Sequence, residues 1–226
     1  KVGIETTFVG HPLANKIPIK SNMDKYRKIL KLNRKEVVIA LLPGSRMGEL
    51  KAHTKTLLET SQNLLKVYPN ARFLIPANNN KNMNFIKGSL KNNPTKNLKL
   101  IKGNVDEILG SANIAIAASG TASLQIALHK KPMIIIYKGS WISYFIWKMV
   151  RLIPHVSLPN ILLNENFVPE MLQHRATPNL LSKKACEIIK DKKYSKKIES
   201  KFNKLHNALK RNTSSLIFKI IKPYLK

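Results

Sequence analysis

Short apolar runs alternate with longer amphipathic stretches through the first two thirds of the sequence. Most of the apolar runs lack polar alternation, which is typical of strands that are covered on both faces. They predict strands at residues 36–42, 72–75, 98–101, 114–117 and 132–137. The stretches between them repeat apolar residues at helical spacing, which predicts helices at residues 23–32, 48–67, 81–90, 105–109 and 121–129.

This alternation predicts an α/β fold, a Rossmann-like doubly wound parallel sheet with right-handed crossovers. We expect the domain to span residues 21–175 and to bind its ligand beyond the carboxyl ends of the strands. No Gly-x-Gly-x-x-Gly follows a predicted strand, which disfavours a dinucleotide dehydrogenase. Residues 1–20 are expected to be a linker from, or a remnant of, a preceding domain, and residues 176–226 a helical C-terminal extension.

The pattern changes after residue 137. Residues 141–151 hold both tryptophans and are too few to span a bilayer, but they suit an amphipathic helix. Two interpretations stay open for Trp141, Phe145 and Trp147: they contact lipid or acyl chains at a membrane surface, or they pack against a neighbouring domain.

The remaining third is predicted to be mostly helical and strongly basic. Residues 154–163 are expected to be irregular, and residues 168–173 to form a short helix whose first turn accepts a proline. Residues 177–226 have a helical pattern, and from residue 183 onward fourteen Lys and Arg face three acidic residues. Such a charge run is either a solvated helix face or a surface that attracts anionic membrane lipids.

The composition limits the classes of partner. The formal net charge of +28 attracts nucleic acid, anionic lipid and phosphorylated substrates alike. The 33 lysines far outnumber the 7 arginines and occur in every segment, whereas nucleic-acid recognition usually prefers arginine, so nucleic acid is not expected as a partner.

The single cysteine, Cys186, predicts a reducing compartment, and the lack of Cys/His spacing typical of metal sites predicts no metal. The start at Lys1, without an initiator methionine or a leader, favours a fragment of a longer protein.

A small-residue loop follows the predicted strand at 114–117. Ser119, Gly120 and Thr121 would bring the backbone amides of a new helix close to a ligand, and phosphate is the ligand that such amides favour. The alternative is that these residues only cap the helix.

A second loop of the same kind follows the predicted strand at 36–42. Gly44 and Ser45 lead into a helix, and Arg46 adds a guanidinium that can bind a phosphate through two hydrogen bonds. Two such loops in one α/β domain, with Gln125 four positions after Thr121, predict a pocket for a nucleotide sugar.

Six motifs, in their order and spacing, resemble those of lipid-A-disaccharide synthase, glycosyltransferase family 19. They are Val-Gly-His-Pro-Leu-Ala at 9–14, Leu-Leu-Pro-Gly-Ser-Arg at 41–46 with Glu49, Ala-Ser-Gly-Thr-Ala at 118–122, Tyr-Lys at 137–138, Ser-Leu-Pro-Asn-Ile-Leu at 157–162 and Val-Pro-Glu-Met-Leu-Gln at 168–173. The resemblance covers essentially the whole chain, although members of this family are longer and carry an N-terminal Rossmann-like domain.

The resemblance implies a GT-B hexosyltransferase, inverting and metal-independent, that needs no cofactor because the UDP-sugar is a substrate. The substrates would be UDP-2,3-diacylglucosamine and 2,3-diacylglucosamine 1-phosphate, and the product the disaccharide of lipid A. The enzyme would be cytoplasmic and peripheral, on the anionic inner face of the cytoplasmic membrane, with a homodimer suggested. This chain would be its donor-binding part and inactive alone.

The resemblance also implies roles for individual residues. Arg46 matches an essential arginine that would neutralise the diphosphate as UDP leaves, and Asn160 matches an essential asparagine at the donor. Gln173 matches the glutamine at the end of the family's Leu-Gln helix, and all three residues are expected to be catalytic. The other expected contacts to the UDP-sugar are Gly44, Ser45, Ser119, Gly120, Thr121 and Gln125.

One position departs from the family pattern. Gln125 stands where the family usually has a glutamate that accepts hydrogen bonds from the ribose hydroxyls. A glutamine carbonyl lacks the charge that roughly doubles the strength of such a bond, so a Gln125→Glu change is expected to tighten UDP binding.

The resemblance implies that the group that takes the proton from the acceptor hydroxyl lies in the family's N-terminal domain. His11 is a candidate substitute, against a plain role in a linker or interdomain contact.

Two other classes of function stay open. Another GT-B transferase for UDP-sugars, or a UDP-GlcNAc epimerase, would share the nucleotide pocket but would not need the aromatic segment at 141–147. A non-catalytic module would bind anionic lipid or nucleic acid through the Lys-rich helices, and an Arg46→Ala change would then have no effect on binding.

Overall fold

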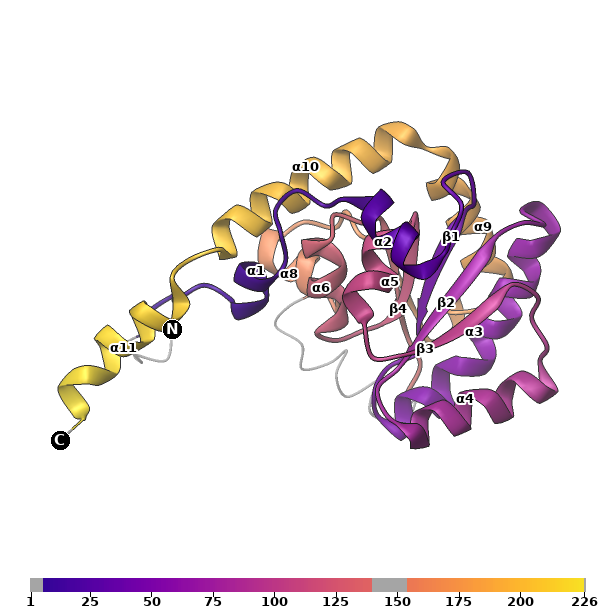
Figure 1. The fold of residues 1–226 in the computed structure, drawn as a ribbon, viewed down its shortest axis with the longest axis horizontal. Coiled ribbons are helices and arrows are strands. Elements are labelled where there is room, and N and C mark those ends of the chain that lie inside the picture. Colours follow the sequence, from indigo (N-terminus) through magenta and orange to yellow (C-terminus); the bar gives the residue numbers. More distant parts are fainter. Residues whose placement is uncertain (1–5, 140–153, 226) are drawn as a thin grey trace.

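The chain folds around a six-stranded parallel sheet with helices on both faces (Figure 1). The structure is a computed structural model that describes residues 6–139 and 154–225. The strand order is β3-β2-β1-β4-β5-β6, so the doubly wound α/β fold expected from the sequence is confirmed. The strands are β1 (Val38–Leu42), β2 (Arg72–Ala77), β3 (Leu98–Lys102), β4 (Ile114–Ala118), β5 (Met133–Tyr137) and β6 (Glu170–Leu172).

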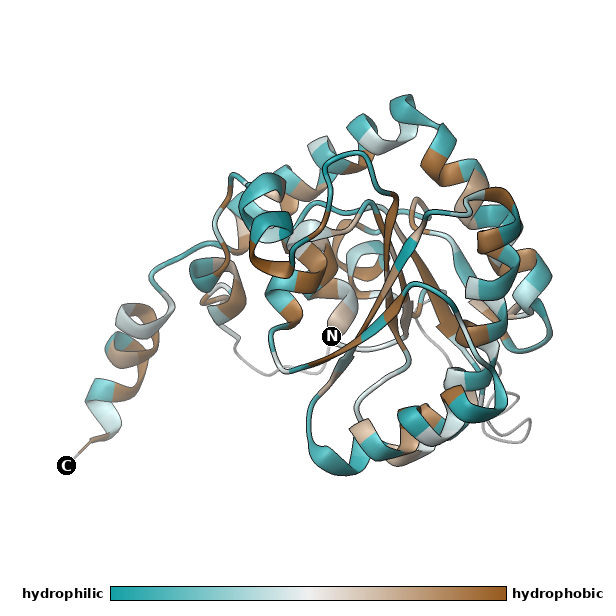
Figure 2. Ribbon diagram, turned by 45° about the vertical axis from the view of Figure 1, so that its right-hand side comes forward, coloured by the Kyte–Doolittle hydropathy of each residue, from teal (hydrophilic) through white to brown (hydrophobic). Residues whose placement is uncertain are grey.

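The central strands β1 and β4 are buried along their whole length, because both faces of the sheet are covered. Alternate side chains of β1 enter different layers: Val38, Ala40 and Leu42 contribute to one apolar cluster, and Ile39 and Leu41 to the other. Figure 2 shows these apolar strands between helices whose outer faces are hydrophilic. The uninterrupted apolar runs in the sequence reflect this two-sided burial.

The helices divide between the two faces of the sheet. One layer contains α1 (Pro12–Lys16), α2 (Met23–Leu30), α5 (Val105–Ser111), α6 (Ala122–Leu128), α8 (Leu158–Leu163) and α10 (Lys192–Leu209). The other layer contains α3 (Met47–Val67), α4 (Asn80–Asn92) and α9 (Pro178–Lys190). The chain ends in α11 (Thr213–Ile221) and a short 3-10 helix, Lys222–Tyr224, which extend away from the sheet (Figure 1).

Two expectations for the segment after the fifth strand are wrong. Residues 168–173, predicted as a short helix, form the edge strand β6, followed by a 3-10 helix at Gln173–Arg175. Backbone pairing with β5 decides this, since Ile136 lies opposite Met171 in the register. Residues 154–163, predicted to be irregular, contain the helix α8, because Pro159 falls in its first turn, where a proline is accepted. The segment at 141–151 lies outside the described residues.

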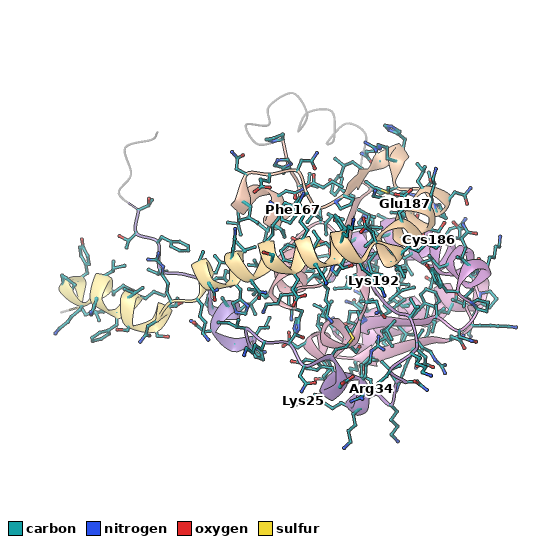
Figure 3. The ribbon with its side chains drawn as sticks, turned by 90° about the horizontal axis from the view of Figure 1, so that it is seen from above. Lys25, Arg34, Phe167, Cys186, Glu187 and Lys192 are labelled. Atoms are coloured by element: carbon teal, nitrogen blue, oxygen red, sulfur yellow. The ribbon has the colours of Figure 1, made fainter. Side chains whose placement is uncertain are left out.

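The helices α9 and α10 pack directly on the sheet layers. Ile198 and Phe202 of α10 are buried in the same apolar cluster as β1 and β4. Phe167 lies against α10 (Figure 3): its ring contacts that of Phe202 edge to face at 5.7 Å, and its carbonyl accepts a hydrogen bond from the Tyr194 hydroxyl at 3.0 Å. The edge of the sheet near β6 is therefore held by α10.

A buried Lys–His contact joins α10 to the N-terminal segment. His206 is fully buried, and its Nε2 lies 2.8 Å from the Ala14 carbonyl oxygen. Its Nδ1 lies 2.6 Å from Nζ of Lys130, which also donates to the Leu128 carbonyl oxygen at 2.6 Å. Burial lowers the pKa of His206, and the nearby Lys130 and Lys210 lower it further. The ring is therefore neutral, with Nε2 as donor and Nδ1 as acceptor.

This contact predicts a loss of stability in mild acid. Because the pKa of His206 is lower in the folded chain than in the unfolded chain, the unfolded chain binds the proton first as the pH falls below about 6.5. The free energy of unfolding therefore decreases from that pH toward the lowered folded-state pKa. We expect the non-titrating His206→Gln variant to show a weaker decrease in urea unfolding between pH 7.5 and 5.5. The exposed His174→Gln change is the control, and equal pH dependence in both variants would contradict the prediction.

Candidate functional site

A cavity of about 360 Å³ lies at the carboxyl ends of β1 and β4. The strand order reverses between these two strands, and such a switch point is where open α/β sheets bind ligands. The cavity brings together seven of the residues expected at the site: Gly44, Ser45, Arg46, Ser119, Gly120, Thr121 and Gln125. It is also lined by Glu49, Asn78 and Val105, which the sequence had not assigned to a ligand.

Glu49 fixes the loop that carries Arg46. One carboxylate oxygen accepts hydrogen bonds from the backbone amides of Ser45 at 2.7 Å and Arg46 at 3.2 Å. The other carboxylate oxygen lies 3.7 Å from the Arg46 guanidinium, whose side chain is 87% exposed. The amides of Ser45 and Arg46 are thus already occupied, whereas the guanidinium is exposed and can bind a ligand. The sequence had predicted a role for the loop, and Glu49 explains how the loop is held.

Gly44 is required by this arrangement. Its φ of +112° lies in the region that side chains rarely adopt, and a Cβ would come within 2.4 Å of the Glu49 side chain. Any residue but glycine would therefore displace the carboxylate that holds the loop.

We expect Gly44→Ala to lower the free energy of unfolding by about 1–3 kcal/mol, because it combines backbone strain with this clash. Gly48, exposed in the first turn of α3 with no atom near its Cβ position, is the matched control: Gly48→Ala should leave the free energy of unfolding unchanged or raise it by less than about 1 kcal/mol. Urea unfolding measures both changes. Equal effects of the two substitutions would show that the contact with Glu49 does not constrain residue 44.

The second loop follows β4, the neighbour of the strand that leads into the first loop. The Ser119 hydroxyl donates to the Val156 carbonyl oxygen at 2.8 Å, which joins this loop to the segment before α8. Thr121 precedes α6 without forming a side-chain cap, so its side chain does not support the interpretation of a simple helix cap. Within the part of the chain that the structure describes, the amides of Gly120 and Thr121 donate to no other protein group.

His53, to which the sequence assigned no partner, connects the first loop to the end of β5. Its Nδ1 lies 3.1 Å from the Pro43 carbonyl oxygen, and its Nε2 accepts a hydrogen bond from the Lys138 amide at 3.0 Å. Burial lowers the pKa of His53, which keeps the ring neutral, able to donate from one nitrogen and accept at the other. No spacing in the sequence could reveal this contact, since it depends on the packing of α3 against the sheet.

Asn160 is placed behind the cavity wall and does not line it. The side chain is fully buried in α8, and its Nδ2 donates to the Val168 carbonyl oxygen and to Glu170, both at 2.9 Å. Its Oδ1 accepts from the amides of Phe167 at 3.2 Å and Val168 at 2.9 Å. Every polar atom of the amide is thus used within the chain. Contact between Asn160 and a donor substrate stays a prediction.

Glu170 is the centre of the network that includes Asn160. Its two carboxylate oxygens accept hydrogen bonds from the Ser157 amide and hydroxyl, at 3.0 and 2.7 Å, and from the Val156 amide at 3.1 Å. Because Val156 in turn accepts from Ser119, Glu170 supports the second loop of the cavity through one intervening residue. Sequence reasoning assigned no role to Glu170, since it expected a helix at this position.

Gln173 lies just after β6, at the same edge of the sheet as the cavity. It is nearly buried, and its amide forms two hydrogen bonds with the backbone of Gly139, at 3.1 Å to Gly139 N and 3.2 Å to Gly139 O. The resemblance placed it at the end of a helix, but it follows a strand and has a positive φ of 49°. It does not line the cavity. Trp141, Phe145 and Trp147 lie outside the described residues.

Two further expectations concern groups away from the cavity. His11 precedes α1, and its Nδ1 accepts a hydrogen bond from the Leu13 amide at 3.2 Å, so the ring caps this helix. Among residues 6–139 and 154–225, no cluster of His, Cys, Asp and Glu has the arrangement of a metal site. In the same residues no helix has the length and apolar content needed to cross a membrane.

The family model described as lipid-A-disaccharide synthetase matches residues 1–221. A curated relative, the lipid-A-disaccharide synthase of Methylobacillus flagellatus, is 34% identical over 228 residues, which is 100% of this chain and 60% of the relative. The chain therefore spans little more than half the length of the relatives that it matches.

Two solved structures share the fold. WaaG, a glycosyltransferase involved in lipopolysaccharide biosynthesis, has a TM-score of 0.60 and 11% identity, over 93% of this chain and 53% of WaaG. The UDP-GlcNAc 2-epimerase of Neisseria meningitidis, bound to UDP-GlcNAc, has a TM-score of 0.52 and 15% identity, over 88% of this chain and 48% of the epimerase. The TM-scores establish a shared fold of the GT-B type, and identities this low show nothing about the reaction.

Proposed function

This chain belongs to the lipid-A-disaccharide synthetase family, and we propose that it is the donor-binding part of a glycosyltransferase of that activity. The enzyme would transfer 2,3-diacylglucosamine from UDP to 2,3-diacylglucosamine 1-phosphate and form the lipid A disaccharide. A mechanism with inversion and without a metal ion is part of the proposal. The chain spans 60% of the relative's length, so the whole reaction is proposed for the longer protein.

The observation that carries the proposal is the cavity between the two loops. It combines the exposed guanidinium of Arg46 with the amides of Gly120 and Thr121, which donate to no group among the described residues, and the amide side chain of Gln125. A nucleoside diphosphate presents complementary groups: charged oxygens for the cation and amides, and hydroxyls for the glutamine. Arg46 would neutralise the charge that develops on UDP as the bond to the sugar breaks.

The buried amides act on this site through the backbone. Asn160 and Glu170 order the turn that accepts a hydrogen bond from Ser119, and Gln173 holds the backbone of Gly139. We therefore propose positioning roles for Asn160 and Gln173 beside the catalytic roles that the family resemblance implies. No proton transfer is assigned to His11, whose ring nitrogen caps α1.

Association with the inner face of the cytoplasmic membrane is also part of the proposal, and so is a homodimer. The chain from residue 183 onward carries fourteen Lys and Arg against three acidic residues, which favours an anionic surface. The helix α11 adds exposed apolar side chains: Ile217, Phe218, Ile220 and Ile221. The basic charge of residues 183–226 and the apolar exposure of α11 together are the combination that peripheral membrane binding needs.

The donor site is tested by UDP binding. We expect Arg46→Ala to weaken UDP binding about 10- to 100-fold, the effect of losing a hydrogen bond to a charged group, and Arg46→Lys to weaken it less. Arg34 is the matched control, because it is also an exposed arginine paired with a carboxylate, Asp24, at 2.8 Å. Arg34→Ala removes the same charge from the overall field but lies outside the cavity lining.

Isothermal titration calorimetry with UDP measures all three variants. If the unaltered chain has no affinity for UDP, or if Arg46→Ala and Arg34→Ala weaken binding equally, the donor-site assignment fails. The second outcome would instead fit a module that attracts anions through its overall charge.

The membrane contact is tested with vesicles. Phe218 and Ile221 are 58% and 44% exposed on α11, and we expect replacement of both by Ser to reduce binding to vesicles that contain anionic lipid. The control is Ile29→Ser, since Ile29 is 48% exposed on α2. Cosedimentation measures the bound fraction. Equal binding of the two variants would remove α11 from the proposed membrane contact.

A further inference from the structure

A second cavity, of about 500 Å³, lies beside the first and shares two wall residues with it, Val105 and Gln125. Its lining includes several charged side chains, among them Lys16 and Asp106. Gln125 thus separates the candidate nucleotide site from a charged hollow on α1, α2 and α5. What lies behind Gln125 decides which end of its amide can face a ligand.

Asp106 lies behind Gln125 and sets the direction of its amide. The Nε2 of Gln125 donates to Oδ1 of Asp106 at 2.7 Å. A carboxylate can only accept, so Nε2 must be the atom turned toward Asp106, and Oε1 is left for the other side. No described protein group donates to Oε1 of Gln125, while the residue lines the first cavity.

The Asp106 carboxylate is itself firmly held. The buried His129 lies with its Nε2 3.0 Å from the same Oδ1, and Lys16 Nζ lies 3.8 Å from Oδ2. The His129 ring packs edge to face against Tyr26 with the centroids 5.9 Å apart. The hydrogen bond from His129, joined by that from Gln125, lowers the pKa of Asp106 to about 2, so the group is a carboxylate at neutral pH.

We propose that Asp106 is a positioning residue of the nucleotide site, which turns Oε1 of Gln125 toward the cavity as the acceptor for the ribose hydroxyls of a nucleoside diphosphate. This inference rests on the proposed donor site. Asp106 and Gln125 then form one unit with a single negative charge. The charge lies on Asp106, behind the cavity wall, and the neutral amide of Gln125 lines the cavity.

The unit changes the expectation for Gln125→Glu. A glutamate at this position would bring a second carboxylate to within hydrogen-bond distance of Asp106, with no proton between them. The new carboxylate would either take up a proton, and so lose its charge, or move away from Asp106, and so lose the contact that holds it toward the ribose. The single change should therefore not tighten UDP binding, in contrast to what the sequence alone suggests.

The double variant Gln125→Glu/Asp106→Asn moves the charge to the cavity side and keeps the total charge unchanged. With its Nδ2 in the place of Oδ1, the introduced asparagine would donate one N–H to the introduced glutamate and the other to Nε2 of His129, in the tautomer that accepts there. Its Oδ1 would face Lys16, so every contact of the unit keeps a partner. Each variant is titrated at pH 8 with UDP and with 2′,3′-dideoxy-UDP, which lacks the ribose hydroxyls. The ratio of the two dissociation constants reports the ribose contact alone, and thermal unfolding confirms that each variant is folded.

We expect the unaltered chain to prefer UDP by a few-fold to about tenfold, the value of one neutral hydrogen bond. The double variant should exceed the preference of the Gln125→Glu variant by about 5- to 10-fold, because its acceptor is charged. Asp106→Leu, which removes the acceptor behind Gln125, should bring the preference close to one.

The inference is overturned if Gln125→Glu alone equals or exceeds the double variant, or if Asp106→Leu keeps the preference of the unaltered chain. In both cases UDP would still bind, so the donor site itself would stand. If the unaltered chain does not bind UDP, the donor site fails and this inference fails with it.

Discussion

The candidate site depends on one topological constraint: β1 and β4 are neighbours in the sheet although two strands and three helices lie between them in the chain. Because both strands are parallel, the loops after them leave at the same edge, and because the order reverses between them, no crossover helix fills the space. Arg46 and Gly120 are brought together by this arrangement and by no local interaction. The other features of the site hold these two loops in place.

Carboxylates do most of that holding. The chain has only 12 Asp and Glu against 40 Lys and Arg, so acidic groups are scarce. Three of them support the cavity: Glu49 binds the amides of the first loop, Glu170 orders the segment that receives Ser119, and Asp106 holds Gln125. None of the three has to touch a ligand to do so. The excess positive charge is thereby left for an anionic ligand, while the local acids fix the geometry that presents it.

The sequence predicted five of the strands and the location of the cavity, because these depend on patterns within short segments. Uninterrupted apolar runs mark strands buried on both faces, and glycine with small polar residues marks the loops at their ends. The edge strand β6 was missed because its three residues, at Glu170–Leu172, are only half-buried and follow a proline, which resembles the start of a helix.

The contacts of His53, Glu170 and Asp106 were missed for another reason. Each joins residues at least ten positions apart, and only the packed fold brings them together.

The central claim is that UDP occupies the cavity between the two loops, and amide chemical shifts measure this directly. In a titration of the isotopically labelled chain with UDP, we predict the largest shifts at residues 119–125, together with shifts at 44–46. The amides of Gly120 and Thr121 have no acceptor in the described part of the chain and can therefore bind the ligand. Residues of α9, which contribute to the other apolar layer and do not line the cavity, should not move. Shifts that are absent from both loops, or that spread evenly over the lysine-rich helices, would contradict the account.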